Sequence, residues 1–121
     1  VNPEKSFLSK DDVTEVFVPS FECEMGILKD YISIISFLKP GVIKIFSKST
    51  EEHYYVEDGI VEFKSNNLSI LTSSIVNVKE MDKSKINEFL KQAENESNIN
   101  GITDQKKYLL DQKIETLKSL N

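Results

Sequence analysis

The fold is decided by the stretch ISIISFLKPGVIKIF, residues 32–46, in which two apolar runs flank the turn Lys39-Pro40-Gly41. The two runs, 32–38 and 42–46, are rich in β-branched and aromatic side chains, which favour strands. Proline fixes φ in a turn and glycine tolerates φ > 0, so the pair interrupts the apolar run at one point. The stretch therefore predicts two strands joined by a tight turn.

The same alternation of short strand and turn extends outward over residues 1–79. Further strands are expected at residues 13–18, 53–56, 60–63 and 68–71. Polar segments separate the downstream strands, at residues 48–52, 57–59 and 64–67. Turns that recur every ~8–12 residues are typical of a β-sandwich or a β-barrel. Residues 1–79 are therefore predicted to form an all-β domain.

From residue 80 the apolar period becomes that of a helix. Two stripes recur at helical spacing, and they consist of Ile86, Phe89, Leu90 and Ala93, and of Leu109, Leu110, Ile114 and Leu117. Asp82 or Ser84 can cap the first helix, and Thr103 or Asp104 the second. With a polar break at 95–101, residues 80–121 are expected to form an antiparallel helical hairpin, which makes the chain an α+β protein.

The first of these helices is predicted to be short. At about eleven residues it lies below the length at which an isolated helix becomes even marginally stable in water. Its apolar stripe must therefore lie on the second helix, on the β-domain or on a partner. A hairpin with so little core is an element that can dock or leave.

Composition excludes some functions. The net charge is −5, and all fifteen basic residues are lysine. A nucleic-acid binder needs a basic face, and without arginine the chain has no bidentate guanidinium group for phosphate. The single cysteine, Cys23, rules out an intrachain disulfide and fits a reducing compartment. No signal peptide is expected at the polar start, and no apolar run approaches the ~18 residues that cross a bilayer.

Few residues suit catalysis. His53 is the only histidine, so a metal site or a nucleophile–histidine pair would depend on it, and a half-buried strand position is the simpler interpretation. Cys23 lies between Glu22 and Glu24, which raise a thiol pKa rather than activate the thiol. We therefore expect no enzyme, no metal and no cofactor.

Five segments in order resemble one family. They are Val1-x-Pro3-Glu4-Lys5 with Phe7-Leu8-Ser9, Val18-Pro19 before Glu24-Met25-Gly26-Ile27-Leu28, Leu38-Lys39-Pro40-Gly41-Val42, Gly59-Ile60-Val61-Glu62-Phe63, and Leu68-Ser69-Ile70-Leu71. With the helical hairpin after them, the chain resembles the epsilon subunit of F-type ATP synthases, the equivalent of the mitochondrial delta subunit. The first segment is similar to the family's first hairpin. The chain departs from the family at Lys29-Asp30-Tyr31, where Pro-Gly-His is usual, and near Lys10, where one residue looks inserted.

The resemblance implies a sandwich of about ten strands with a C-terminal hairpin, held on the central rotor stalk. Its implied partners are the gamma subunit and the c ring, at the cytoplasmic face of the bacterial inner membrane, with catalysis left to the alpha/beta head. By this resemblance Glu24, Met25 and Tyr31 are expected to contact the c ring or gamma. For Glu24 the alternative is a solvated turn residue, and for Tyr31 a side chain half packed on the sandwich.

The resemblance also implies a hairpin that can extend along gamma and block ATP hydrolysis. The residues expected to serve this regulation are Ile86, Phe89, Leu90, Leu109, Leu110, Ile114 and Leu117. Four lysines of the second helix, Lys106, Lys107, Lys113 and Lys118, can meet an acidic segment of the beta subunit. The alternative is an ordinary solvated helix surface.

Some members of the family bind ATP through the motif aliphatic-Asp-x-x-Arg-Ala. Here Met81 and Asp82 match, but Lys85 and Ile86 replace arginine and alanine. Lysine can meet a phosphate only as a point charge. We therefore expect Asp82 to cap the helix and Lys85 to be solvated, with ATP binding as the secondary hypothesis.

Two other classes of protein compete with the rotor subunit. One is an adaptor whose hairpin binds another protein helix, with no gamma subunit as its partner. The other is a small enzyme or a ligand-binding barrel, which requires polar groups that converge in a pocket.

Overall fold

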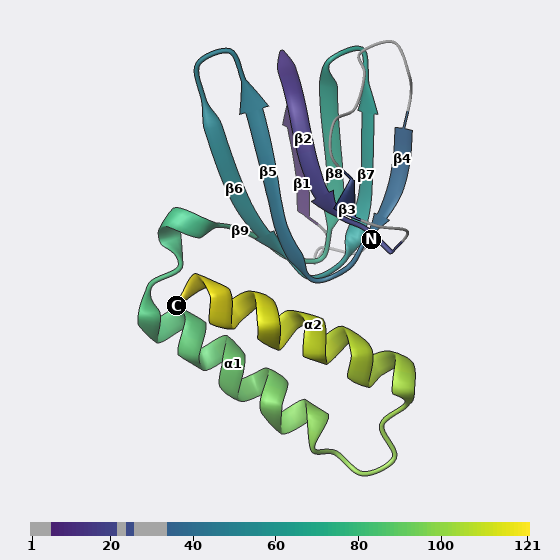
Figure 1. The fold of residues 1–121 in the computed structure, drawn as a ribbon, viewed down its shortest axis with the longest axis vertical. Coiled ribbons are helices and arrows are strands. Elements are labelled where there is room, and N and C mark those ends of the chain that lie inside the picture. The colour runs from purple at the N-terminus through teal and green to yellow at the C-terminus, as the bar shows by residue number, and fades with distance from the viewer. Residues whose placement is uncertain (1–5, 22–23, 26–33) are drawn as a thin grey trace.

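The computed structural model describes residues 6–21, 24–25 and 34–121, and in them two antiparallel sheets stand above two helices (Figure 1). The four-stranded sheet has, in spatial order, β1 (Ser6–Lys10), β8 (Asn67–Thr72), β7 (Gly59–Lys64) and β4 (Ile34–Leu38). The five-stranded sheet has β3 (Glu24–Met25), β2 (Val13–Pro19), β5 (Gly41–Ser47), β6 (Glu51–Val56) and β9 (Ile75–Asn77). The predicted α+β class is confirmed, with nine described strands where about ten were expected.

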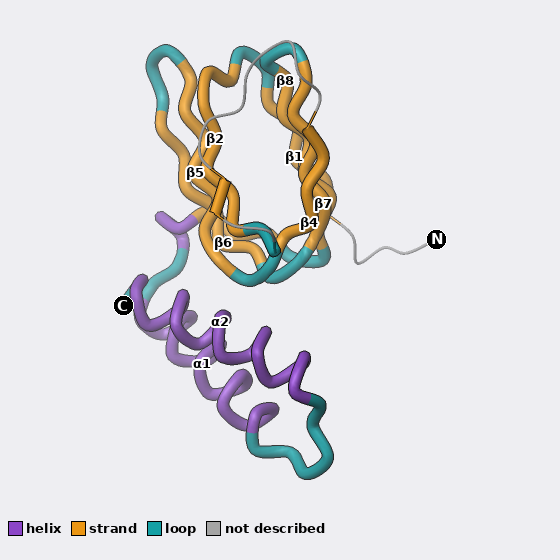
Figure 2. Tube along the Cα trace, turned by 45° about the vertical axis from the view of Figure 1, so that its right-hand side comes forward, coloured by secondary structure: helices purple, strands orange, loops and turns teal. Residues whose placement is uncertain are grey.

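The main core lies between the two sheets, which face each other as opposite walls in Figure 2. Alternate residues of each strand point inward, so Val16, Ile43, Val61 and Ile70 are 0–1% exposed. Glu52 and Tyr54 of β6 also turn toward the other sheet. The Glu52 carboxylate forms an ion pair with Lys10 of β1. The same carboxylate accepts a hydrogen bond from the Tyr54 hydroxyl at 3.0 Å. Both sheets are thus joined by apolar packing and by one polar cluster.

The turn that decides the fold joins two sheets rather than two neighbouring strands. β4 pairs with β7, whereas β5 pairs with β2 and β6, so the chain crosses from one sheet to the other at Lys39 and Pro40. Gly41 does not have the positive φ that its place in a turn suggested. It is needed because a Cβ there would lie 2.6 Å from the Pro19 side chain. The requirement for glycine is therefore a close approach.

One further strand prediction was wrong, and another lies partly outside the described residues. The first hairpin was expected at residues 1–9, of which 1–5 are not described; in the described part β1 pairs with β8 and β2 with β5, and the turn at Asp12 (φ 58°) carries the chain between sheets. Residues 51–52, expected in a polar loop, begin β6 and pair with Ile45 and Phe46. Their carboxylates suit a strand because one faces solvent and the other meets Lys10.

The helical hairpin follows a short 3₁₀ turn, η1 (Val78–Glu80), and consists of α1 (Lys83–Ser97) and α2 (Asp104–Leu120). Asp82 caps α1 by accepting from the Lys85 amide at 2.8 Å, and Thr103 caps α2 by accepting from the Lys106 amide at 3.1 Å. α1 has fifteen residues, not about eleven, because the polar residues 95–97 continue the helix. In both views the hairpin lies across one end of the sandwich (Figures 1 and 2).

Candidate functional site

The outer side of the four-stranded sheet carries an apolar row. The register places Phe7 opposite Leu71, Leu71 opposite Ile60, and Ile60 opposite Phe37, so one residue of each strand contributes. These side chains are 67%, 42%, 41% and 57% exposed in the order Phe7, Leu71, Ile60 and Phe37. Ile35, two positions from Phe37 on the same face of β4, is 63% exposed. We call these five residues the apolar row.

A continuous strip of exposed aromatic and aliphatic side chains across a sheet is typical of a protein-binding surface. The sequence predicted residues 32–38 as one apolar strand without assigning its sides, so this strip was not found from the sequence. In the structure Ser36 faces inward, 6% exposed, and its two apolar neighbours face out. The sequence did offer one signal: β4 carries apolar residues on both of its sides. A strand of a sheet with one face in water needs apolar residues on its buried side alone.

The outer side of the five-stranded sheet meets the hairpin instead. Tyr55 of β6 is fully buried there, in a second core that includes Met81, Ile86 and Leu117. Its ring lies 6.1 Å from the ring of Phe89, centroid to centroid. The neighbours Tyr54 and Val56 point to the opposite side of β6 and pack in the main core, whereas Tyr55 belongs to this second core. We call it the docking core.

The residues predicted for the regulatory hairpin divide between two contacts. Ile86 and Leu117 are 1% and 0% exposed within the docking core, and Phe89 and Leu90 pack on it. Leu110 is 6% exposed, and Leu109 and Ile114 are half-buried, along the hairpin itself. The first helix therefore packs on both the β-domain and α2. These are two of the three surfaces that the sequence analysis offered for its apolar stripe.

A polar cluster stands at the edge of the docking core. The Tyr55 hydroxyl donates to Glu57 Oε2 at 3.1 Å, and the Lys113 ammonium of α2 lies 3.1 Å from the same oxygen. Burial raises the pKa of Tyr55 far above its usual value, and the neighbouring Glu57 carboxylate raises it further. Tyr55 therefore stays protonated and acts as a hydrogen-bond donor throughout the physiological range.

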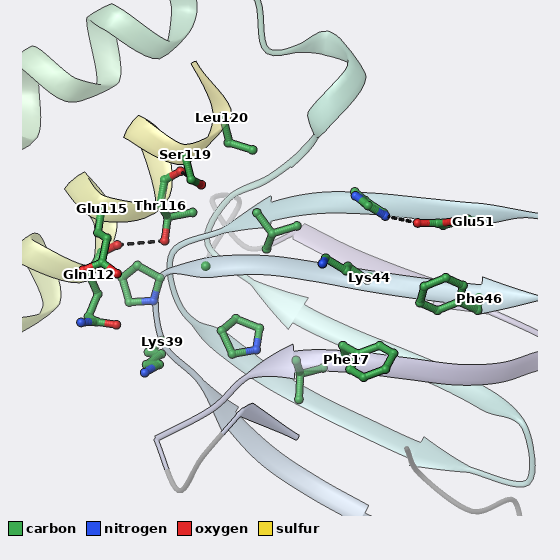
Figure 3. Close-up of a pocket in the computed structure, with 16 residues that line it drawn as sticks. Phe17, Lys39, Lys44, Phe46, Glu51, Gln112, Glu115, Thr116, Ser119 and Leu120 are labelled. Atoms are coloured by element: carbon green, nitrogen blue, oxygen red, sulfur yellow. Dashed lines mark hydrogen bonds and ion pairs between the residues drawn. The ribbon is translucent and has the colours of Figure 1, made fainter. Parts of the chain in front are cut away.

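A groove of about 580 Å³ lies between α2 and strands β2 and β5 (Figure 3). Phe17 and Phe46 form an edge-to-face pair on it, with ring centroids 5.8 Å apart. Lys39 and Lys44 line it together with Glu51 and Glu115, so charges of opposite sign balance. The groove is open to solvent on one side, and its lining carries charges of both signs.

Two titratable residues of the groove pair with each other. His53 Nε2 lies 2.6 Å from Glu51 Oε2 in a pair at the surface, drawn in Figure 3. Within the ranges that the structure describes, no three His, Cys, Asp or Glu side chains are placed to hold a metal ion. None of the described helices has the length and hydropathy to span a bilayer.

The structure describes the backbone of two of the three residues predicted to contact the c ring or gamma. Glu24 and Met25 form β3, at the edge of the five-stranded sheet, opposite Pro19 and Val18. Tyr31 and Cys23 lie outside the described residues. Asp82 caps α1, and Lys85 is exposed in its first turn.

An antiparallel sandwich that leaves one apolar outer side open and holds a helical hairpin at the other defines a subunit built for protein contacts. The sequence profile described as "ATP synthase, Delta/Epsilon chain, beta-sandwich domain" matches residues 1–78. The chain belongs to this family of ATP synthase subunits. The family expected from the sequence is thereby confirmed, and its members are non-catalytic components of the complex.

Similarity extends through the hairpin. The ATP synthase epsilon chain of Pelagibacter ubique is 75% identical over all 121 residues, which cover 93% of that protein. The mitochondrial ATP synthase subunit delta of Schizosaccharomyces pombe is 35% identical over 79% of this chain and 59% of its own length. A chain in the central stalk and c-ring structure of Tetrahymena thermophila mitochondrial ATP synthase has the same fold, with a TM-score of 0.55 and 15% identity over 91% of this chain and 83% of that chain.

Proposed function

We propose that this chain is the epsilon subunit of the central rotor stalk in a proton-translocating F-type ATP synthase, where it links the gamma subunit to the c ring. The observation that carries the proposal is the 75% identity to an epsilon chain across both the sandwich and the hairpin. The alternative, an adaptor for an unrelated partner, does not account for similarity to an epsilon chain in both the sandwich and the hairpin.

The apolar row is the proposed contact with gamma. Four strands offer five exposed apolar side chains in a fixed register, and antiparallel pairing makes the surface stiff. A subunit that passes torque needs an interface that does not yield, and apolar area on a rigid sheet provides one. On the other sheet, the outer side meets the hairpin at Tyr55.

The c-ring contact is assigned to the segment that includes β3. Glu24 and Met25 sit on the edge strand of the five-stranded sheet, and Tyr31 follows in the sequence. An edge strand is open to solvent on one side, which suits a contact with polar loops of a ring. Such contacts would hold the chain peripherally at the cytoplasmic face of the bacterial inner membrane.

The hairpin is the proposed inhibitor of ATP hydrolysis. In the docked arrangement Ile86 and Leu117 are buried, so extension along gamma requires the docking core to open. Lys106, Lys107 and Lys118 are exposed and available to an acidic partner, whereas Lys113 is held by Glu57. Deletion of residues 102–121 should raise hydrolysis by the assembled complex, and an unchanged rate would leave α2 as a solvated helix.

Regulatory ATP binding finds little support. The Asp82 carboxylate is engaged by the Lys85 amide as a helix cap, and the Lys85 side chain is exposed. Calorimetry with millimolar ATP should give no heat of binding. A saturable heat that Asp82→Ala abolishes would revive ATP as a ligand.

The central test is a pull-down with the gamma subunit of the same genome, followed by size-exclusion chromatography. We expect a stable 1:1 complex that Phe37→Asp disrupts, because a charge then enters the apolar row. The matched control is Phe17→Asp, an exposed strand phenylalanine on the other sheet, which should leave the complex intact.

Two outcomes contradict this assignment. If both folded proteins stay separate, the adaptor becomes the better description. If the complex forms and Phe37→Asp does not weaken it, gamma binds a different face.

A further inference from the structure

The docked hairpin is held by two kinds of contact. The docking core buries apolar side chains, which attract one another without fixing a direction. Among the described residues, one ion pair joins the hairpin to the sandwich, between Lys113 of α2 and Glu57. Because apolar packing has no preferred direction, the ion pair at its margin is the contact that fixes the orientation of the hairpin on the sandwich.

The sandwich contributes to the position of Glu57. This residue lies in the turn between β6 and β7, and the Tyr55 hydroxyl, two residues earlier in β6, donates to its Oε2. The next residue, Asp58, accepts from the Ser73 amide at 2.9 Å and from the Ser73 hydroxyl at 2.8 Å, which fixes the turn to the chain beyond β8. The sandwich therefore fixes the turn that carries Glu57 and gives its carboxylate one hydrogen bond.

Lys113 completes the cluster from the hairpin. Its side chain is 14% exposed and that of Glu57 28%, so the pair is partly shielded from water. The other ion pairs of the described residues, Lys10–Glu52 and His53–Glu51, lie within the sandwich. An ion pair that is partly shielded from water and shares its oxygen with a second hydrogen bond is less screened by solvent and better fixed in geometry than a surface pair.

We propose that Glu57 is a latch for the hairpin, with Tyr55 as its positioning residue and Lys113 as the group it holds. The latch selects the docked arrangement of α2 without contributing to the folding of the sandwich. It operates in the isolated chain, so it goes beyond the assignment to the rotor stalk and does not depend on it.

The test compares two lysines of α2 in the full chain by amide hydrogen exchange. Lys113→Met keeps the length of the side chain and the helix propensity but removes the charge from the latch. The matched control is Lys118→Met, since Lys118 is exposed and one helical turn further on. We expect α2 amides to exchange about tenfold faster in Lys113→Met, as for loss of a hydrogen bond to a charged group. Amides of β7 and β8 should not change.

Exchange of the two charges supplies a rescue. Glu57→Lys should release α2 as Lys113→Met does, and the double variant Glu57→Lys with Lys113→Glu should return its exchange to within about threefold of the original chain. A change confined to global stability would not recover in this way.

Three results overturn the latch. They are unchanged α2 exchange in Lys113→Met, equal acceleration by Lys118→Met, and equal acceleration of β7 and β8. Binding of Lys113→Met to gamma is measured in parallel. Because the apolar row is untouched, failure of the latch and failure of the gamma contact give different results.

Discussion

The outer side of the four-stranded sheet is bare and apolar, whereas the outer side of the five-stranded sheet meets the chain's own hairpin at Tyr55. Both sides carry large side chains, yet Phe7 is 67% exposed and Tyr55 is fully buried. The difference lies in what covers these two residues: the hairpin of the same chain covers Tyr55, and a proposed second subunit covers Phe7. Burial therefore predicts where a substitution harms stability and where it harms assembly.

The largest expected effect separates two leucines. Leu117→Ala removes a fully buried side chain from the docking core and should destabilise the docked hairpin by about 3 kcal/mol, the cost of a cavity plus lost burial. Leu71→Ala in the apolar row should change the stability of the isolated chain by less than about 0.5 kcal/mol. Urea unfolding followed by circular dichroism measures both. Equal losses would mean that the two sides do not differ as described.

Alkaline pH should affect the hairpin side through Tyr55. Its pKa in the folded protein is raised above the usual 10.0, so the folded state binds the proton more tightly than the unfolded state. The stabilisation is complete below about pH 10 and is lost as the pH rises further. Hydrogen exchange of α2 should therefore accelerate above this pH, beyond the intrinsic effect of hydroxide.

Tyr55→Phe is the control for that pH dependence. It should cost about 1 kcal/mol at neutral pH, through loss of the hydrogen bond to Glu57, and remove the contribution of Tyr55 at alkaline pH. The pKa values of Tyr54 and Lys10 are raised as well, so these two residues still contribute to the pH dependence of the sandwich in this variant. If α2 responds to alkali equally in Tyr55→Phe, Tyr55 is not the group that titrates.

The smallest expected effect concerns the start of α1. Asp82→Ala removes the cap on the Lys85 amide and should destabilise the hairpin by about 1 kcal/mol. Asp82→Asn retains an oxygen for the cap and should lose less. Thermal unfolding distinguishes the two. Equal losses would point to the charge of Asp82 rather than to its hydrogen bond.

Local patterns explain what could be predicted from the sequence. The helical stripes, the caps at Asp82 and Thr103, and most strands depend on residues a few positions apart, and these predictions were confirmed. The family also followed from short segments in the right order, and the profile match confirmed it.

The remainder depends on distant partners. The need for glycine at position 41 comes from Pro19, more than twenty residues away, and a polar Glu52 fits in β6 because Lys10 faces it from the other sheet. Which side of β4 faces the core depends on its place in the sheet, and the apolar run 32–38 did not indicate that Ser36 faces inward and Phe37 outward. The pairing of Lys113 with Glu57 likewise requires the docked hairpin.

The pairing of β1 with β8 has a consequence for how the chain reaches this structure. Ser6 pairs with Thr72, so the first described strand has no partner until more than sixty further residues have left the ribosome. Pairings between distant segments form slowly, whereas helices form from neighbours within microseconds. During synthesis Phe7 therefore waits in an open strand, and the four-stranded sheet closes only once β8 has emerged. The hairpin is made after that point, so it meets a sandwich that is ready to receive it.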